Sequence, residues 1–503
     1  MSLAVRRARV LLIAVIAILL ALVPAGHTWA RSGPPATPPG LARAAPHEVW
    51  ALDQGTDLIH IHDSRADLDE VATIDVSADV LRDAGFPLGT GVKNVVPHMI
   101  EFDSQYRYAF VAATAGGVTI VIDARSRTVV EVLPTGPASH MAAVTPDDSA
   151  VWVSVIGSVD PSTQALVEIP LDLDAVDPQF AIGRKVVVKN VLEPYAEARG
   201  WEFPGYQPVC HQYTPDSREA WVTLGPQWDR GGLFVLDLET ATVTAAWDPE
   251  VVKANCGVGV NREGTRVVAN WSGTVLGPGQ DTEGEWYLFN AKNKRLLRTE
   301  SARGFDAHGV RFTPDGRYLW AVNRISDNGL VIDGRSFRVI HEIDRIGDSP
   351  DILDFSPDGS LVYVTQRGPA PRSGGVHAAS GQQPGFAVLD AATRRTLRVI
   401  EPPRTTSADG VVLNDLHGIG VRPIGPSERV PGPAAGAVAS SGGVAGSGPR
   451  RRSELRVPRD GRDGRKRAER VVTAAGLPAA GRTTTSAPRR SRGPLRSRDP
   501  GRS

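Results

Sequence analysis

The sequence has little of what marks several simple classes of protein. Its 503 residues include only two cysteines, too few for a scaffold that depends on several disulfides. The longest apolar run, residues 10–23, has 14 residues, which is short for a membrane-spanning helix. The Gly-x-Ser-x-Gly elbow of a serine hydrolase is absent, and no glycine-rich stretch leads into a helix as a phosphate-binding loop does.

The first 30 residues have the features of a secretory signal peptide. Arg6, Arg7 and Arg9 precede the apolar run, and residues 24–30 end in a small-residue cleavage site. Because the run is too short for a hydrocarbon core of ~30 Å, we expect a cleaved leader and no stable membrane span after cleavage. The mature protein is then secreted or extracytoplasmic, in the periplasm or cell envelope. The export route stays open.

The net charge of zero hides an uneven distribution. Residues 450–503 contain 16 Arg, one Lys and five acidic residues, whereas residues 31–449 contain 36 basic and 51 acidic residues. An acidic body argues against nucleic acid as a partner of the folded part. Residues 425–503 are rich in Arg, Pro, Gly and Ala and cannot bury a core, so we predict a disordered tail there. Residues 31–45 are expected to be a linker.

One pattern recurs along the body of the chain. In its clearest copy, residues 308–316, apolar residues alternate as in a half-buried strand, and Pro-Asp-Gly follows as a tight turn. A second alternating strand, residues 318–322, comes directly after the turn. Seven copies begin at His98, His140, Val209, Cys256, His308, Asp351 and His417.

Each repeat contains four strands, which is the content of one propeller blade. The last copy has only its innermost strand, while three unassigned strands lie near the N-terminus at residues 49–53, 58–62 and 70–76. We therefore predict an all-β, seven-bladed β-propeller over residues 46–424. Its N-terminal strands complete the last blade and close the ring.

These repeats resemble those of the YVTN-type propeller family. The resemblance lies in residues 307–316, residues 350–359 and the run Val362-Tyr-Val-Thr365. Trp-Asp occurs only twice, so WD-repeat proteins are a less apt comparison. The resemblance implies kinship with lactonase-type propellers, surface-exposed repeat proteins, the haem domain of a nitrite reductase and the propeller of nitrous-oxide reductase. The resemblance predicts the fold and does not predict which reaction or ligand the protein has.

The first residue of each repeat is expected to line the mouth of the central channel, on the face that bears the longer loops. Four of these seven residues are His, although the chain has only 11: they are His98, His140, His308 and His417. Converging imidazoles can bind a transition metal such as Cu, Fe or Zn, and a haem would need only one of them as axial ligand. His211, expected to point to the same side one step deeper, and Cys256 could join such a site. Alternatively, these side chains hydrogen-bond the backbones of neighbouring blades.

Two insertions are expected on the same face, at residues 190–208 and 366–385. Tyr195, Trp201 and Tyr206 of the first could stack on a sugar, a lactone or another planar ring, or could pack on each other as a cap. Arg367 of the second is a further candidate for ligand binding.

The two cysteines, Cys210 and Cys256, fall at nearly equivalent places in adjacent repeats. In an oxidising compartment they could form one disulfide, and two free thiols are the alternative.

Three functions remain open at this point. The favoured one is an exported propeller that binds a small molecule or a cell-surface or protein partner on its loop-bearing face. The second is a metal- or haem-dependent oxidoreductase with a histidine-lined channel. The third is a lactonase-like hydrolase in which His308 and Asp351 serve as general base.

Overall fold

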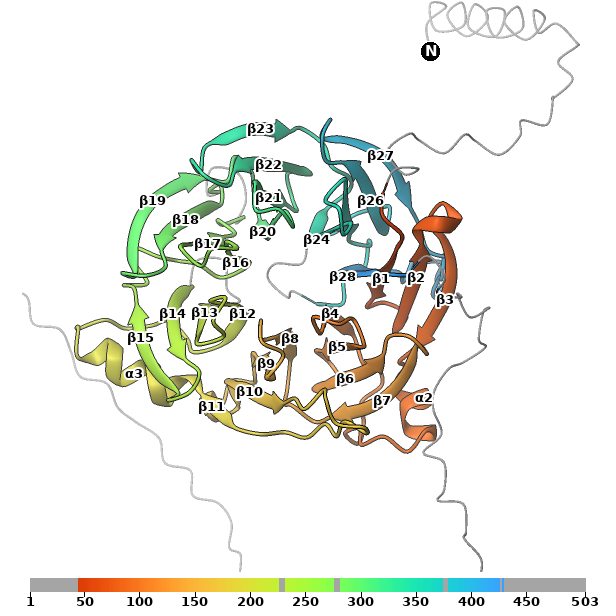
Figure 1. Ribbon diagram of the computed structural model, residues 1–503, viewed down its shortest axis with the longest axis horizontal. Coiled ribbons are helices and arrows are strands. Elements are labelled where there is room, and N and C mark those ends of the chain that lie inside the picture. Colours follow the sequence, from red (N-terminus) through yellow and green to blue (C-terminus); the bar gives the residue numbers. More distant parts are fainter. Residues whose placement is uncertain (1–43, 226–230, 276–280, 374–378, 426–427, 429–503) are drawn as a thin grey trace, which may run out of the picture. The chain divides into compact units, whose positions relative to one another are not determined.

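Seven four-stranded antiparallel sheets are arranged around a common axis in the computed structural model (Figure 1). The structure describes residues 44–225, 231–275, 281–373, 379–425 and 428. The predicted seven-bladed β-propeller is therefore confirmed. The predicted signal peptide, almost all of the linker and residues 429–503 of the predicted tail lie outside the described residues.

Blades are numbered here along the chain, each from its innermost strand outward. Blade 1 consists of β4 (Pro97–Phe102), β5 (Tyr108–Ala113), β6 (Val118–Asp123) and β7 (Thr128–Leu133). Blade 2 consists of β8 (Ser139–Val144), β9 (Ala150–Val155), β10 (Ala165–Pro170) and β11 (Lys185–Val187). Blade 3 consists of β12 (Pro208–Tyr213), β13 (Glu219–Leu224), β14 (Gly232–Asp237) and β15 (Thr242–Ala246). Blade 4 consists of β16 (Val258–Val260), β17 (Arg266–Trp271), β18 (Glu285–Asn290) and β19 (Arg295–Ser301). Blade 5 consists of β20 (Ala307–Phe312), β21 (Tyr318–Asn323), β22 (Asn328–Asp333) and β23 (Val339–Ile343). Blade 6 consists of β24 (Pro350–Phe355), β25 (Leu361–Gln366), β26 (Gly385–Asp390) and β27 (Arg395–Ile400).

Blade 7 joins the two ends of the propeller. Its innermost strand is β28 (Leu416–Pro423), which pairs with β1 (His47–Asp53), and β2 (Leu58–Asp63) and β3 (Asp69–Asp75) complete the sheet. The register places His47 opposite Pro423 and Trp50 opposite Gly420. The N-terminal strands thus close the ring in the predicted way.

Short helices lie outside the sheets. They are α2 (Ala78–Asp83), α3 (Val188–Glu197) and the 3-10 turns η2 (Ser64–Ala66) and η3 (Pro161–Thr163). No helix among the residues described above has the length and apolar character that crossing a membrane requires.

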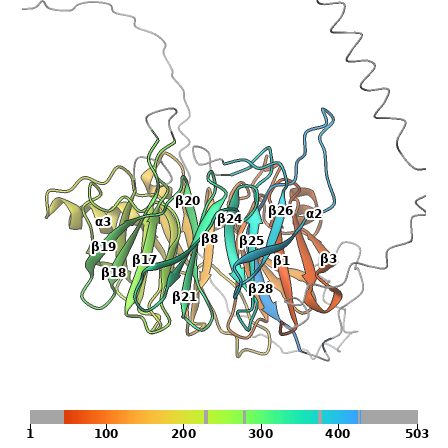
Figure 2. The ribbon, with the colours of Figure 1, turned by 90° about the horizontal axis from the view of Figure 1, so that it is seen from above.

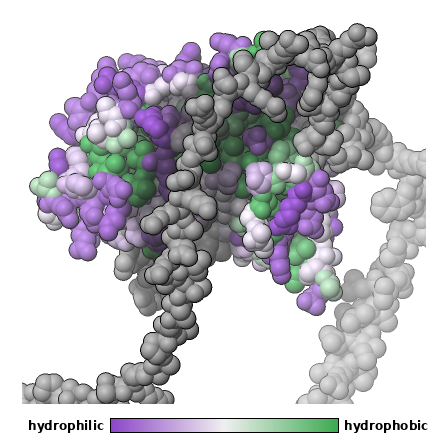
Figure 3. Space-filling model, turned by 90° about the horizontal axis from the view of Figure 1, so that it is seen from below, coloured by the Kyte–Doolittle hydropathy of each residue, from purple (hydrophilic) through white to green (hydrophobic). Residues whose placement is uncertain are grey.

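The core lies between neighbouring blades. The third residue of the second strand is a large aromatic residue in five of the first six blades, and each of these side chains is at most 1% exposed: Phe110, Trp152, Trp221, Trp320 and Tyr363. Outermost strands such as β19 are mostly exposed. Figure 3 shows mainly hydrophilic side chains on one side of the molecule, with hydrophobic ones gathered in patches. Burial of aromatic rings between the sheets thus stabilises the ring.

A β-bulge interrupts the start of six of the seven innermost strands. The register shifts within the first residues of β4, β8, β12, β20 and β24, and opposite the start of β28. A bulge leaves a residue outside the regular ladder and redirects its side chain. The residues at these bulges include the first residues of the repeats, among them His98, His140, His308, Asp351 and His417.

Glycine follows the first residue in three repeats because the next blade passes very close. A Cβ atom on Gly309 would lie 2.3 Å from the carbonyl oxygen of Asp351, and one on Gly418 would lie 2.4 Å from that of His98. A threonine also bridges neighbouring blades: Thr365 Oγ1 accepts from Ile352 N (3.0 Å) and donates to the carbonyl of His417 (2.6 Å). The repeat starts are therefore held against one another.

We expect Gly418→Ala to lower the free energy of unfolding by about 1–3 kcal/mol, since the added methyl group overpacks the contact between blades 7 and 1. Gly89→Ala is the control, because its Cβ would meet only Val92 Cγ2, at 3.5 Å. Chemical denaturation measures both variants. Equal stability of the two would show that the close approach at Gly418 is not a constraint.

Candidate functional site

The four histidines predicted to line the channel mouth do come together. The ring centroids of His98 and His417 are 3.9 Å apart with 23° between the planes, and those of His98 and His140 are 4.2 Å apart. His308 lies 5.7 Å from His417. All but His140, which is half-buried, are at most 8% exposed.

Asp351 holds two of these imidazoles. One carboxylate oxygen lies 2.6 Å from His308 Nδ1, and the other accepts a hydrogen bond from His417 Nδ1 at 2.6 Å. Two guanidiniums also face the carboxylate, Arg367 at 3.1 Å and Arg324 at 3.6 Å. The Asp351 side chain has no exposed surface.

Each of these arginines is anchored by a second carboxylate. Arg324 donates two hydrogen bonds to Asp306 (2.8 and 3.0 Å), and Arg367 donates two to Asp415 (2.7 and 2.8 Å). Both arginines are at most 1% exposed. Three carboxylates face two guanidiniums, so these five groups carry one net negative charge. We call His98, His140, His308, His417, Asp351, Arg324, Arg367, Asp306 and Asp415 the mouth cluster.

Hydrogen bonds fix the tautomers of three histidines. His417 and His140 donate from Nδ1, to Asp351 and to the carbonyl of Val209 (2.9 Å) respectively, so their Nε2 atoms are acceptors. His98 is the opposite tautomer, because its Nδ1 accepts a hydrogen bond from the Gln54 amide and its Nε2 therefore carries the proton. Ser373 donates to Gln54 Oε1 at 2.7 Å, which orients that amide. Within the mouth cluster, four buried atoms of the described residues have no hydrogen-bond partner: Nε2 of His98, Nε2 of His417, Nδ1 of His308 and Oδ1 of Asp351.

Burial keeps these imidazoles neutral. It lowers the pKa of His140 to about 3 and that of His98 well below its usual value. Burial also lowers the pKa of His417 to about 4, although the Asp351 carboxylate acts in the opposite direction. Burial alone would raise the pKa of Asp351, but His417, His308 and Arg324 hold it well below its usual range.

The geometry does not suit one metal ion shared by the predicted histidines. The rings of His98 and His417 stack face to face, so their nitrogens do not converge on a common point. Over the described part of the chain, no three His, Cys, Asp or Glu side chains are grouped so that they could hold a metal ion. Metal or haem binding by His98, His140, His308 or His417 stays a prediction.

His211 and Cys256, the two further metal candidates, do not complete such a site. The bulge between Pro208 and His211 changes the alternation of β12, and His211 is buried with Nδ1 2.7 Å from Ser154 Oγ and Nε2 3.0 Å from the Tyr213 hydroxyl. The expectation that His211 points into the channel mouth was therefore wrong.

Cys210 and Cys256 are free, buried thiols, so of the two alternatives left open by the sequence the structure has the free thiols. The two strands are held by Thr223, whose hydroxyl accepts from Cys210 N (3.1 Å) and donates to the carbonyl of Cys256 (2.8 Å). Burial raises the pKa of the Cys210 thiol to about 12.

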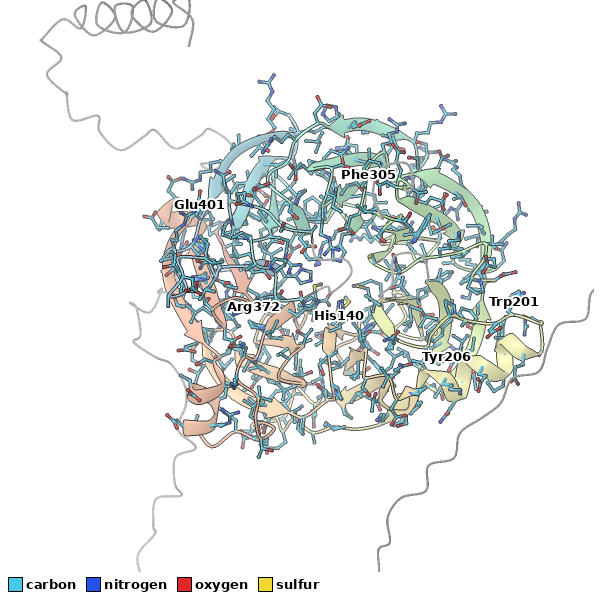
Figure 4. The ribbon with its side chains drawn as sticks, turned by 180° about the vertical axis from the view of Figure 1, so that it is seen from behind. His140, Trp201, Tyr206, Phe305, Arg372 and Glu401 are labelled. Atoms are coloured by element: carbon cyan, nitrogen blue, oxygen red, sulfur yellow. The ribbon has the colours of Figure 1, made fainter. Side chains whose placement is uncertain are left out.

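The aromatic insertion lies away from the channel. Residues 188–197 form α3, and Figure 4 shows Trp201 and Tyr206 at the outer rim of the ring while His140 is near its centre. Tyr195, Trp201 and Tyr206 pack against the core of blades 2 to 4, and the Arg199 guanidinium lies 3.5 Å from the centre of the Tyr195 ring. They lie at the rim because Val188, Leu192 and Ala196 anchor one face of α3 there, and ligand binding by these aromatic side chains stays a prediction.

Loops do cover the mouth cluster elsewhere. The backbone N–H of Arg372 donates to Asp415 at 2.7 Å, and Arg372 lies near the ring centre in Figure 4. The segment between β27 and β28 projects from one end of the ring (Figure 2). Arg367, predicted as a ligand-binding residue, lies inside the cluster and is fully buried.

Sequence reasoning missed Asp306, Arg324 and Asp415. A signal was present in the register of the repeats: both aspartates stand two residues before a repeat start, and Arg324 and Arg367 each follow directly after a second strand. Charged residues at such repeated positions indicate a buried network when read together.

No family model matches the sequence, and no curated protein matches it. Solved structures with a similar fold include hydrazine synthase of Kuenenia stuttgartiensis, with 12% identity, a TM-score of 0.48, and coverage of 69% of this chain and 90% of that one. Dihydro-heme d1 dehydrogenase NirN in complex with DHE has 13% identity, a TM-score of 0.43 and coverage of 80% and 78%. A functionally unknown protein of Desulfotomaculum acetoxidans has 14% identity, a TM-score of 0.43 and coverage of 60% and 82%. At these values the similarity says nothing about activity.

The buried neutral histidines predict loss of stability in mild acid. The folded-state pKa of His140 is about 3, against an ordinary value of 6.5, so between these values the unfolded chain binds more protons than the folded one. Stability therefore falls as pH falls through this window, whereas the contribution of Asp351, whose pKa is lowered from 3.8, is lost only at lower pH. We expect His140→Gln to reduce the slope of unfolding free energy against pH by up to about 1.4 kcal/mol per pH unit. Equal slopes in denaturant titrations of wild type and variant would contradict this assignment.

Proposed function

We propose that this chain is an exported propeller of the YVTN type that binds a small ligand at the mouth cluster. The observation that carries the proposal is the pair of buried imidazole nitrogens without a hydrogen-bond partner among the described residues, Nε2 of His98 and Nε2 of His417. Buried polar atoms in folded proteins are normally satisfied, and exceptions call for a specific explanation. A bound ligand is such an explanation.

The tautomers indicate the chemistry of the ligand. His98 Nε2 donates and His417 Nε2 accepts, so a hydroxyl group, which can do both, complements the pair. The low exposure of His98, His308 and His417 favours a small molecule over a protein surface, since a large partner cannot reach residues that are at most 8% exposed. Sugars, hydroxy acids and lactones are the classes that fit.

Lactone hydrolysis is a second candidate because Asp351 lies 2.6 Å from Nδ1 of His308. An ionised carboxylate at this distance stabilises the imidazolium that forms when His308, as general base, takes a proton from water while the water attacks the lactone carbonyl. His308 also lines a cavity on the propeller axis, so water can approach it.

The test is calorimetric titration of the purified chain with a panel of sugars, hydroxy acids and lactones, together with an assay of lactone turnover. His417→Gln is expected to weaken binding about tenfold or more, which corresponds to one lost hydrogen bond in a buried site. His341→Gln is the matched control, because His341 lies on β23, the outermost strand of blade 5.

The outcomes separate the two candidates. Binding without turnover supports a binding protein, whereas turnover that His308→Gln abolishes while binding persists supports the hydrolase. The proposal is contradicted if no member of the panel binds, or if His341→Gln weakens binding as much as His417→Gln.

A further inference from the structure

Three of the five sulfur-containing residues of the chain line one cavity. The chain has only three Met and two Cys, and Met99, Met141 and Cys210 surround a cavity of about 50 Å³ together with His308. Met141 is 4% exposed and Cys210 is 9% exposed, whereas Met99 is only half-buried, so the cavity is open to solvent on one side.

The register of the repeats brings these sulfurs together. Met99, Met141 and Cys210 each follow the first residue of a repeat, in blades 1, 2 and 3, which are consecutive around the ring. They therefore form an arc one step below the mouth cluster. Across the axis the same position is taken by Gly257, Gly309 and Ile352, which also line the cavity. Sulfur therefore lines only the side of the cavity formed by blades 1 to 3.

The donor set matches a soft monovalent cation. Thioether and thiolate sulfur select Cu(I), and imidazole is compatible with it, whereas Mg²⁺, Ca²⁺ and Mn²⁺ prefer oxygen ligands. The carboxylates and guanidiniums of the adjacent mouth cluster carry one net negative charge, which favours a cation nearby. Glu101 and Arg311, which also line the cavity, have opposite charges.

We propose that Met99, Met141, Cys210 and His308 form a binding site for one Cu(I) ion in the axial cavity. The metal enters as Cu(I), so no electron is transferred. The Cys210 thiol becomes a thiolate on binding and releases its proton to solvent, while the two thioethers and the imidazole bind as neutral donors. This site shares His308 with the histidine site predicted from the sequence but takes its other donors from sulfur, and Cu(I) binding does not require the small ligand proposed above.

The experiment is an anaerobic titration of the full chain with Cu(I) in competition with a chromophoric Cu(I) chelator. We expect one equivalent to bind, and we expect the double variant Met99→Leu/Met141→Leu to lose affinity by on the order of 100-fold or more. Leucine conserves the volume of methionine, so the fold is retained. Ile352→Leu is the matched control, because it changes the same cavity without removing sulfur.

Cys210→Ser provides a second variant if the double variant does not fold, and it should also weaken binding. X-ray absorption of the copper-loaded chain is expected to show sulfur neighbours that are depleted in these variants. Equal Cu(I) affinity in wild type, Met99→Leu/Met141→Leu and Cys210→Ser, or a copper shell without sulfur, would overturn the proposal. Weak ligand binding at the mouth together with normal Cu(I) binding would count against the proposed function alone.

Discussion

The propeller exists as a closed ring because β28, the last strand of the described residues, pairs with β1, the first of them. This pairing also assembles the site, since it brings Asp415 and His417 from one end of the chain beside Gln54 and His98. The Gln54 amide contacts Arg367 and His98, and His98 stacks on His417. An opening of this blade would therefore separate the groups of the mouth cluster, so the stability of the closure and the geometry of the site are coupled.

Within the ring, Asp351 is the group around which the mouth cluster is arranged. It contacts His308, His417 and Arg367, and its carboxylate has no exposed surface. Burial of charge carries a large desolvation cost, and a well-packed apolar cluster is often at least as stable. Arg324 and Arg367 each pair with a further carboxylate, Asp306 and Asp415 respectively. With Asp351 included, the three carboxylates and two guanidiniums still carry one net negative charge. Such a network is weak support for the fold, and it is the place where we propose that a ligand binds.

Much of this could be predicted from the repeats, because alternating apolar residues and Pro-Asp-Gly turns are local signals of strands and hairpins. The convergence of His98, His140, His308 and His417 followed from their equivalent positions. What could not be predicted depends on geometry that alternation does not encode. The bulge in β12 turns His211 away from the channel mouth, and the apolar face of α3 holds Trp201 at the rim. Asp306 and Arg324, each considered alone, have the sequence features of surface charges, and only a comparison of the repeats indicates that they pair.

The central claim is that the mouth cluster holds neutral histidines in fixed tautomers. Nitrogen-15 NMR of the histidine side chains near neutral pH tests it most directly, because imidazole tautomers and imidazolium have distinct patterns of correlation to the ring protons. The account predicts the Nδ1–H tautomer for His140 and His417 and the Nε2–H tautomer for His98. Imidazolium signals for these residues, or averaged tautomers such as those of an exposed histidine, would contradict it.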